Sequence, residues 1–282
     1  NPSYAEAISN LGSAKLRDFD FANGWRLRES RWSDYDLKAE IQRFRKPQWD
    51  GRPTEHLFVW GEQGIGDEVM SGSCLDELLC LSKKLTVSVN GKSLELFRRS
   101  FPRINFIDRN RFIDFQFDDH IPSMSALGYL RQTKQCFDKV SNNFLKPEIA
   151  LTQNVKSHLR DMAGKKQIIG VSWKSVAKRV GEKRSIPLNL LIEKIPTEAF
   201  LVNLQYGDVK QEILNAKRST GVQVNQLEDL DLTDNMDHFA ATIAACDSVV
   251  SVDNSTVHFA GGVGQLCRVL LPYSSDWRWG TR

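Results

Sequence analysis

VVSVDNSTVHFAGGVG, residues 249–264, is the stretch that indicates the fold most directly. It begins with an apolar run that suits a buried strand and ends at Asp253. A short helix is predicted over 256–261, and a second apolar strand follows over 266–271. Two strands joined by a helix at this spacing predict a parallel sheet with a crossover helix.

The same alternation of strands and helices extends through two halves of the chain. In the first half, strands are predicted over 56–60, 85–89, 104–108 and 112–117, with helices over 68–81 and 94–101. In the second half, the further strands are predicted over 167–173, 200–204, 222–224 and 248–252, with helices over 155–162, 188–194, 209–216 and 236–246. Residues 142–152 are expected to be a linker. Two α/β halves joined in this way predict a ligand cleft at the carboxyl ends of the strands.

Residues 4–32 are predicted to form two helices, because apolar residues recur at three-residue spacing from Ala5 to Ala14. The string EAISNLGSAKLRDFDFANGW resembles a tetratricopeptide repeat, with a Leu-Gly pair in the first helix and an aromatic and a small residue in the second. A single unit cannot bury its faces, so we expect the hairpin to end a longer array or to cap the next domain. A plain helical hairpin is the alternative. Residues 33–54 are polar and contain proline, which is typical of a connector.

Length, charge and cysteine usage limit the class of protein. The 282 residues suggest two domains, and 41% hydrophobic with 26% charged residues is ordinary for a globular protein. The 38 Lys and Arg residues nearly balance the 35 Asp and Glu residues, which argues against a general nucleic-acid binder. No apolar run suits a transmembrane helix, and the first residues lack a signal-peptide pattern, as if the chain starts inside something longer. The five cysteines form no Cys-x-x-Cys pair, so we expect a reducing, cytoplasmic location.

The first segment that carries chemistry is VWGEQGIGDEVM, residues 59–70. Glycines that would let the backbone turn tightly and approach a ligand lie between its predicted strand and helix, at Gly61, Gly64 and Gly66. Their spacing fits neither the dinucleotide fingerprint nor the P-loop. Asp67 and Glu68 then open the helix and are expected to point toward the cleft. Asp67 is either a helix cap or a general base facing a bound hydroxyl.

The second segment is GVSWKSVAKRVGEKRSIPL, residues 170–188, in which a strand runs into a basic loop. The loop has five cations in eleven residues, with one acid: Lys174, Lys178, Arg179, Lys183, Arg184 and Glu182. Such a loop suits the oxygens of a phosphate, whereas the simpler interpretation is a solvated basic loop.

The third segment is the opening stretch itself. Asn254, Ser255 and Thr256 precede a helix whose free N–H groups and positive dipole end can bind a phosphate. Asn254 or Ser255 is, in the alternative, only a helix cap. His258 lies on the same helix and, taken alone, is more often a hydrogen-bonded structural histidine.

Together these segments resemble the bacterial heptosyltransferase-type glycosyltransferases of family 9, in particular relatives fused behind tetratricopeptide repeats. The shared features are strand–GxGD–helix, a Lys-Arg loop followed by proline, SVDNSTVHFAGGVG, and the terminal LLPYSSDWRWG. The resemblance implies the GT-B fold, an α/β architecture in which two Rossmann-like domains with parallel sheets face a cleft, without a need for metal. The expected domains are a helical hairpin with its connector at 1–50, an acceptor-side domain at 51–150 and a nucleotide-sugar-binding domain at 151–282.

The resemblance also implies roles for single residues. Asp67 would be the base that activates the acceptor hydroxyl, with Gly64 and Gly66 beside the ligand. Lys183 or Arg184 would bind the donor diphosphate. The residues implied to hold the donor's phosphates, sugar or nucleotide are Gln205, Tyr206, Met236, Asp253, Asn254, Ser255, Thr256 and His258. The chain departs from the family pattern at Asn254-Ser255 and at Arg268.

The expected reaction is metal-independent transfer of a sugar from a nucleotide-diphosphate sugar to a hydroxyl of a glycan, lipid-linked or protein acceptor, with no further cofactor. Asp118, Asp119 and His120 could mimic a metal site, but adjacent carboxylates after a short strand are more often solvated. The main alternative is a catalytically degenerate scaffold whose hairpin binds a protein partner. An NAD-dependent, epimerase-like enzyme fits less well, because the fingerprint glycines and the acidic residue after the second strand are missing.

Overall fold

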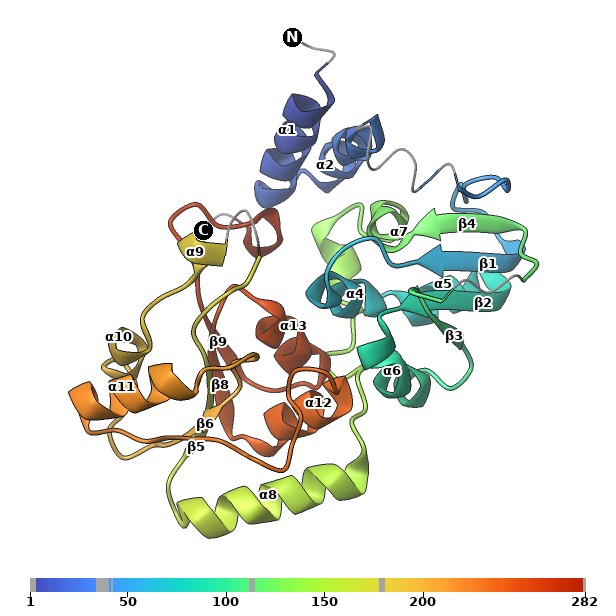
Figure 1. The fold of residues 1–282 in the computed structure, drawn as a ribbon. Helices are drawn as coiled ribbons and strands as arrows, with labels where there is room; N and C mark the ends of the chain where they lie inside the picture. Colours follow the sequence, from blue (N-terminus) through green and yellow to red (C-terminus); the bar gives the residue numbers. More distant parts are fainter. Residues whose placement is uncertain (1–3, 34–40, 42, 112–114, 178–180, 281–282) are drawn as a thin grey trace. The chain divides into compact units, whose positions relative to one another are not determined.

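The structure is a computed structural model that describes residues 4–33, 41, 43–111, 115–177 and 181–280. It divides into two compact units: the first comprises Asn1–Gly91, Phe101–Ser141 and Tyr273–Arg282, and the second comprises Lys92–Ser100 and Asn142–Pro272. Each unit contains one sheet of parallel strands with helices packed on it (Figure 1). Parallel neighbours need crossover connections, and the alternating apolar runs predict such connections. The α/β class is therefore confirmed.

The sheet of the first unit has four parallel strands in the order β3-β2-β1-β4. The strands are β1 (Thr54–Trp60), β2 (Ser82–Val89), β3 (Asn105–Asp108) and β4 (Asp119–Pro122). Phe58 in β1 is paired with Thr86 on one side and with His120 on the other. The last five residues of β1 are buried. An apolar strand therefore takes a position with neighbours on both sides, as expected for a strand covered on both faces.

Two helices stand where the apolar spacing predicts a single helix over 68–81. They are α4 (Ile65–Gly72) and α5 (Leu75–Cys80). The break lies at Ser73 and Cys74, whose Oγ and Sγ atoms donate hydrogen bonds to carbonyl oxygens of the preceding turn at 2.7 and 2.9 Å. Such side-chain bonds compete with the regular helix ladder. The single-helix prediction is wrong for this reason.

The strand predicted over 112–117 is wrong in the part that the structure describes. Its first three residues lie outside the described residues, and 115–117 form no strand. The fourth strand is β4 instead, and it leads directly into α7 (Ser123–Leu130), a helix that the apolar spacing does not predict. The two phenylalanine rings of 115–117 pack on Phe58 at centroid distances of 5.0 and 5.3 Å. These apolar rings therefore pack on the sheet and do not add a strand to it.

The connector predicted over 33–54 contributes to the first unit. Gln48 forms a parallel bridge with His120 of β4, and Trp49 is only 1% exposed. The Trp49 Nε1–H donates to the carbonyl oxygen of Arg52 at 2.7 Å. A polar, proline-containing segment thus places a large ring in the core, so the expectation of a simple connector is wrong here.

The two helices predicted within 4–32 are present as α1 (Ala5–Arg17) and α2 (Phe21–Arg28). Their close packing depends on Gly12 and Gly24, because a Cβ on these glycines would lie 2.7 and 2.6 Å from atoms of the facing helix. The hairpin is confirmed as a hairpin, and its identity as a tetratricopeptide repeat stays a prediction.

The hairpin is anchored within the first unit by tryptophans. A 3-10 turn, η1 (Glu29–Ser33), follows α2, and the Trp25 Nε1–H donates to the carbonyl oxygen of Arg131 at 2.8 Å. Residues near the end of the chain return to this unit as η4 (Trp277–Trp279). The rings of Trp25 and Trp277 meet edge to face at 5.1 Å. Chain segments from both ends therefore pack on one another.

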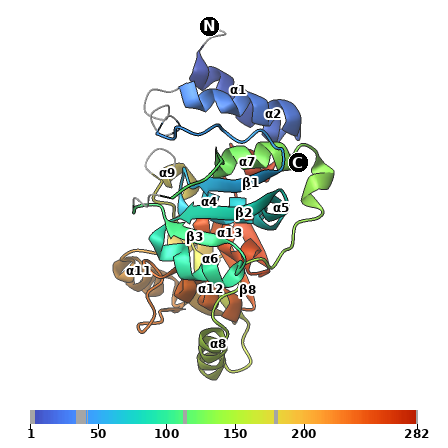
Figure 2. The ribbon, with the colours of Figure 1, turned by 90° about the vertical axis from the view of Figure 1, so that its right-hand side faces the viewer.

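The sheet of the second unit has five parallel strands in the order β7-β6-β5-β8-β9. The strands are β5 (Ile168–Ser172), β6 (Phe200–Asn203), β7 (Val224–Asn225), β8 (Ser248–Val252) and β9 (Cys267–Leu270). The helices are α6 (Leu94–Ser100), α8 (Ile149–Ala163), α9 (Gly181–Arg184), α10 (Leu188–Ile192), α11 (Lys210–Thr220), α12 (Met236–Ala245) and α13 (Ser255–Gly262). Both views show α8 lying beside α12 (Figure 1 and Figure 2).

The linker predicted over 142–152 is a linker only in part. Helix α8 begins within it, because the Glu148 carboxylate accepts hydrogen bonds from two N–H groups of the first turn. Leu145 is completely buried, and its N–H donates to the carbonyl oxygen of Gly262 at 2.8 Å. This segment therefore forms part of the second unit's core.

Both faces of the second sheet are covered by apolar clusters. Ile169 packs in a cluster that includes α10 and α11, whereas its neighbour Ile168 packs in a cluster with α8 and α12. Successive residues of a strand point to opposite faces, so the uninterrupted apolar run of β5 fits a strand buried on both sides. Each fully buried Ile or Val side chain contributes about 1.5–3 kcal/mol relative to exposure.

Candidate functional site

Polar residues lie together at the carboxyl ends of β5, β6 and β8 in the second unit. Gln205 follows β6 and is 2% exposed. Its Oε1 accepts hydrogen bonds from Ser172 Oγ at 3.0 Å, Trp173 N at 3.0 Å and Lys174 N at 2.9 Å. The Gln205 N–H donates to Asn203 Oδ1 at 2.9 Å. One buried amide thus ties the end of β5 to the end of β6, at the edge where α/β sheets bind ligands.

Asn254 joins the end of β8 to the same network. Its Oδ1 accepts from Ser251 Oγ and from Thr256 N, both at 3.0 Å. Its Nδ2 donates to Ser172 Oγ at 2.8 Å and to the carbonyl oxygen of Lys174 at 3.0 Å. These four contacts use the whole hydrogen-bonding capacity of the amide. The side chain therefore caps α13 and orders the loop after β5.

Asp253 and Arg184 form an ion pair that brings the second and third segments together. Asp253 is the first residue after β8 and is 1% exposed. The Arg184 Nε lies 3.3 Å from its Oδ2, and the Arg184 side chain is 19% exposed. A buried carboxylate is costly unless it is paired, so this contact explains why a basic residue follows the loop.

Two polar atoms in this region are buried without a hydrogen-bond partner among the described residues. They are Nε2 of Gln205 and Oγ1 of Thr256. The orientation of the Gln205 amide is set by the backbone N–H groups that its Oε1 accepts. An unsatisfied buried polar group costs about 1–3 kcal/mol. A ligand or an ordered water at the strand ends would satisfy them, so these atoms mark a place for polar contacts.

The cations of the basic loop are not equivalent. Lys174 is paired through Nζ with Glu212 of α11, which also accepts from Trp173 Nε1 at 2.7 Å. Lys183 on α9 is exposed and has no ion pair within the described parts of the chain. Lys178 and Arg179 lie outside the described residues. Among the described cations of the loop, exposed Lys183 and partly exposed Arg184, which lies against Asp253, are the candidates to contact a ligand near the strand ends.

The remaining predicted residues of this unit have different degrees of exposure. Tyr206 is half-buried, accepts a hydrogen bond from Val176 N at 3.3 Å, and has its pKa raised by burial. Met236 starts α12 and is 6% exposed. Ser255 and His258 are partly exposed and lie three positions apart, on one side of α13. The structure thus places Ser255 and His258 where solvent reaches them.

Asp67 lies in the first turn of α4, in the first unit. Its Oδ2 accepts from the Gly64 N–H at 3.2 Å, so the predicted capping contact is present. Its Oδ1 lies 2.9 Å from Nη2 of Arg278 in η4, and the Asp67 side chain is 16% exposed. Spacing in the sequence does not reveal this partner, because 211 positions separate the two residues.

The glycines of this loop do not turn the chain through a positive φ, and their approach to a ligand stays a prediction. None of Gly61, Gly64 and Gly66 has a positive φ, so tight turning through angles that favour glycine is not found. At Gly61 space is limiting, because a Cβ would lie 2.9 Å from Glu68 Oε1 and 3.1 Å from the carbonyl oxygen of Ser88. At Gly64 a Cβ would make only ordinary van der Waals contact. Crowding by a buried carboxylate is therefore the physical reason for the first glycine.

Glu68 is 3% exposed and lies inside the unit, which contradicts the expectation that it points toward a cleft. Its two carboxylate oxygens accept from the Asn90 N–H at 3.1 and 3.0 Å, and Oε1 lies 2.7 Å from Arg109 Nη1. Burial raises the pKa of Glu68 to about 7, opposed by the Arg109 charge and the Asn90 N–H. Neighbouring carboxylates on one helix thus have separate environments.

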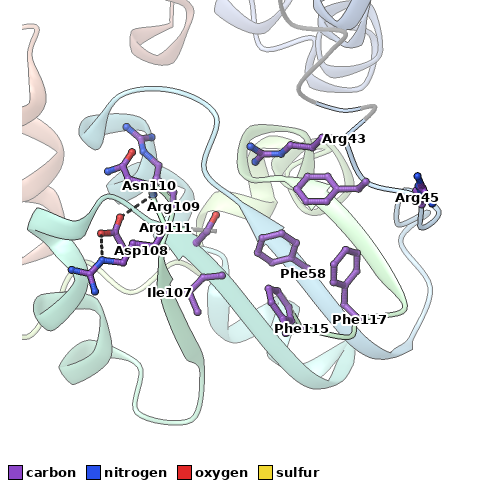
Figure 3. A pocket seen from close by; sticks show the side chains of 12 residues that line it. Arg43, Arg45, Phe58, Ile107, Asp108, Arg109, Asn110, Arg111, Phe115 and Phe117 are labelled. Atoms are coloured by element: carbon purple, nitrogen blue, oxygen red, sulfur yellow. Dashed lines mark hydrogen bonds and ion pairs between the residues drawn. The ribbon is translucent and has the colours of Figure 1, made fainter. Parts of the chain in front are cut away.

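A cavity of about 480 Å³ lies beside β1, β2 and β3 in the first unit (Figure 3). Its aromatic wall consists of Phe44, Phe58, Phe115 and Phe117. On the polar side, Asp108 Oδ1 accepts from Asn110 N at 3.0 Å, and Asp108 Oδ2 lies 3.6 Å from Arg111 Nε. Arg109, the partner of Glu68, lines the same cavity. An apolar wall with a few polar groups is the usual composition of a small-molecule pocket.

The part of the chain that the structure describes contains no group of three His, Cys, Asp or Glu side chains placed to hold a metal ion. Of the residues that could mimic such a site, His120 accepts through Nδ1 from Trp60 Nε1 at 3.1 Å, and Asp119 accepts from the Thr54 hydroxyl. Among the described helices, none has the length and apolar character needed to cross a membrane.

Comparison with known sequences gives one clear relative. No family model matches the chain. Protein FlbA of Caulobacter vibrioides is 32% identical over an alignment 282 positions long that covers 92% of this chain. The chain spans 46% of the length of that relative. It therefore corresponds to less than half of the relative.

Comparison with solved structures concerns the fold. The glycosyl transferase family 9 structure from Veillonella parvula matches with a TM-score of 0.54 at 10% identity, over 82% of this chain and 84% of that chain. ADP-heptose lps heptosyltransferase II of E. coli matches with a TM-score of 0.49 at 13% identity, over 78% of this chain and 91% of that chain. The first likeness shows that the chain shares the fold of a family 9 glycosyltransferase.

Proposed function

We propose that this chain contains a glycosyltransferase that moves a sugar from a nucleotide-diphosphate sugar to a hydroxyl group of a glycan, lipid-linked or protein acceptor. The observation that carries the proposal is the ion pair of buried Asp253 with Arg184 at the carboxyl ends of parallel strands, where Nε2 of Gln205 and Oγ1 of Thr256 have no hydrogen-bond partner among the described residues. The likeness of fold to the family 9 structure supports the reaction class.

The donor is assigned to the second unit. Arg184 is fixed by Asp253 yet keeps 19% of its side chain exposed, and Lys183 is exposed next to it. A leaving diphosphate gains negative charge in the transition state, so cations and the N-terminal dipole of α13 would stabilise that state more than the intact donor. Ser255 and His258 are the exposed side chains of α13 that could contact the donor.

Proton acceptance is assigned to Asp67 in the first unit. Its carboxylate is oriented from two directions, by the Gly64 N–H and by Arg278. An oriented carboxylate that retains some exposure can take the proton of an acceptor hydroxyl as that oxygen attacks the anomeric carbon. The bond from that carbon to the diphosphate breaks, and the leaving group departs with the electron pair.

Thermal-shift and calorimetric titrations of the full chain with UDP- and ADP-sugars test the proposal. A donor that binds only the folded chain must raise the melting temperature. Lys183→Ala should weaken binding by about tenfold, because it removes one charge-assisted contact without disturbing a buried pair. Lys217→Ala, at an exposed lysine of α11, is the matched control and should bind as the wild type does.

A failure to bind any nucleotide sugar would overturn the proposal. That result would favour the alternative of a catalytically inactive scaffold, in which the hairpin of α1 and α2 binds a protein partner. Equal donor affinity in the Lys183→Ala and Lys217→Ala variants would remove the diphosphate role of Lys183 alone.

A further inference from the structure

A second cavity of the first unit, about 320 Å³ in volume, lies between the hairpin and the residues around η4. Three arginines line it: Arg17 of α1, Arg28 of α2 and Arg278 of η4. Asp276 is the one carboxylate among the described residues that line it. The walls therefore carry net positive charge, which attracts an anion.

Arg28 lines this cavity without an ion pair to any of the described residues. Its Nη1 donates to Ser13 Oγ at 2.6 Å, and its guanidinium lies 5.2 Å from the centre of the Trp277 ring. Within the described ranges, no carboxylate lies at ion-pair distance from it. Burial lowers the pKa of Arg28, and the charges of Arg31 and Arg278 lower it further, whereas the charges of Asp276 and Glu62 raise it. A largely buried cation beside other cations is costly unless an anion joins it.

The nearby carboxylates are held by Arg278. Its Nη2 lies 2.9 Å from Asp67 Oδ1, and its Nε lies 3.0 Å from Asp276 Oδ1. Asp276 therefore lies at ion-pair distance from Arg278, and its charge also acts on Arg28. The same contacts connect the cavity to the candidate base, because Arg278 lines the cavity and binds Asp67 directly.

We propose that this cavity binds a compact oxyanion, a carboxylate or a phosphate group, carried by the acceptor sugar. The inference rests on the proposed function, since it names the acceptor as anionic. The guanidinium of Arg28 offers parallel N–H groups that match such an anion, and the Asn10 amide offers a further donor. An acceptor held by its anionic group would present a neighbouring hydroxyl to Asp67.

Calorimetric titration of the full chain with glucuronate, glucose 6-phosphate and glucose tests the proposal at constant ionic strength. Binding of glucuronate or of glucose 6-phosphate, with no binding of glucose, is expected, and the tighter of the two identifies carboxylate or phosphate. Inorganic phosphate is titrated in parallel, because equal affinity for it would show that the anion alone is recognised. Affinity should fall as salt is added, because the recognition is electrostatic.

Arg28→Gln should weaken binding of the anionic sugar by at least about tenfold, because it removes a charge-assisted contact. Arg26→Gln is the matched control, since Arg26 is an exposed arginine of the same helix. Arg28 packs on Trp277, so a second variant keeps the test valid if Arg28→Gln does not fold. Ser13→Asp would place a carboxylate against Arg28 and should abolish binding while raising the melting temperature.

Glucose binding as tightly as the anionic sugars would overturn the proposal, as would unchanged affinity in Arg28→Gln or Ser13→Asp. The proposed function fails separately. If nucleotide sugars do not bind but the anionic sugars bind in an Arg28-dependent way, the transfer reaction is excluded and the anion site stands. If nucleotide sugars bind and anionic sugars do not, the donor assignment stands and the anion site is excluded.

Discussion

Nη2 of Arg278 lies 2.9 Å from Oδ1 of Asp67, so a residue close to the end of the chain holds the candidate base at the start of α4. Both side chains are largely buried, with 14% and 16% exposed. Arg278 is itself fixed by Asp276 at 3.0 Å and by the Trp277 ring at 5.3 Å. The orientation of the candidate base therefore depends on a contact between distant parts of the chain.

Asp67→Asn is expected to lower the rate of sugar transfer by at least about a hundredfold, because an amide cannot accept the proton of the hydroxyl. Donor affinity should be unchanged, since the amide oxygen can still accept from the Gly64 N–H. Transfer assays and donor calorimetry measure the two effects. Asp76→Asn, at an exposed position of α5, is the control. Full turnover in Asp67→Asn would show that another group is the base.

Arg278→Met is expected to lower kcat by about tenfold, a typical result when a positioned catalytic group loses its orientation. Arg278→Lys should restore part of the rate, because it keeps a positive charge near Asp67. Comparison of kcat and KM for both variants separates orientation from folding. A purely structural role would lower the amount of folded protein and the melting temperature while leaving kcat per folded chain unchanged.

Glu68 is expected to make stability depend on pH. Burial raises its pKa from the ordinary 4.5 to about 7 in the folded chain, so the folded chain binds this proton more tightly than the unfolded chain does. Its contribution to the free energy of unfolding is therefore complete below about pH 4.5 and is lost as the pH rises through about 7. Glu68→Gln has no charge to develop and should show a flatter profile. Denaturant titrations from about pH 5 to about pH 8 measure both, and parallel profiles would contradict the assignment.

Asn254→Ala is expected to destabilise the second unit by about 2–4 kcal/mol, because it removes a helix cap and leaves buried partners unsatisfied. Donor binding should weaken as well, since the loop after β5 loses its attachment to β8. Asn225→Ala is the comparison, because the side-chain amide of Asn225 makes one hydrogen bond within the described ranges, to the carbonyl oxygen of Leu201 at 2.9 Å. Equal losses of unfolding free energy in the two variants would show that the hydrogen bonds of Asn254 stabilise the second unit no more than the hydrogen bond of Asn225 does.

Gly12→Ala is expected to destabilise the first unit by about 1–3 kcal/mol, because the added methyl group would overlap the facing helix. Gly261→Ala in α13 is the matched control: its Cβ would meet no atom within 4 Å, and its φ is not positive. This variant should be neutral or more stable by up to about 1 kcal/mol, since alanine favours a helix. Thermal unfolding of the two variants measures the difference. A loss of stability in Gly261→Ala as large as that in Gly12→Ala would argue against the packing explanation.

The sequence predicts well those helices and strands in which hydrophobic residues recur with a clear periodicity. Strand β8 (Ser248–Val252) matches its prediction at both ends, and α12 and β1 match within a few residues. Helix ends are predicted wrongly where side-chain hydrogen bonds start or stop a helix at a residue that the hydrophobic periodicity does not indicate. The hydroxyl of Ser73 and the thiol of Cys74 end a helix that apolar spacing continues. The Glu148 carboxylate starts α8 earlier than apolar spacing indicates.

The candidate site is predictable in its segments and not in its contacts. The basic loop and the residues after β8 are visible as motifs, and the structure joins them through Arg184 and Asp253. Whether a cation of that loop faces a ligand depends on its neighbours, as Lys174 shows by pairing with Glu212. Arg28 lies in no motif, and Arg278 lies in the terminal LLPYSSDWRWG without any sign of its partner, because the contacts of both arginines are with residues far away in the chain.

The sequence by itself determined the parallel α/β architecture and the positions of most of its strands, because hydrophobic periodicity is a local property that each segment carries. Only the tertiary structure decided which charges are neutralised. It placed Glu68 inside the first unit, Asp67 against Arg278, and Arg28 in a cavity without a carboxylate partner among the described residues. The physical reason is that the energy of a charge depends on burial and on distance to other charges, and both are set by contacts between segments remote in sequence.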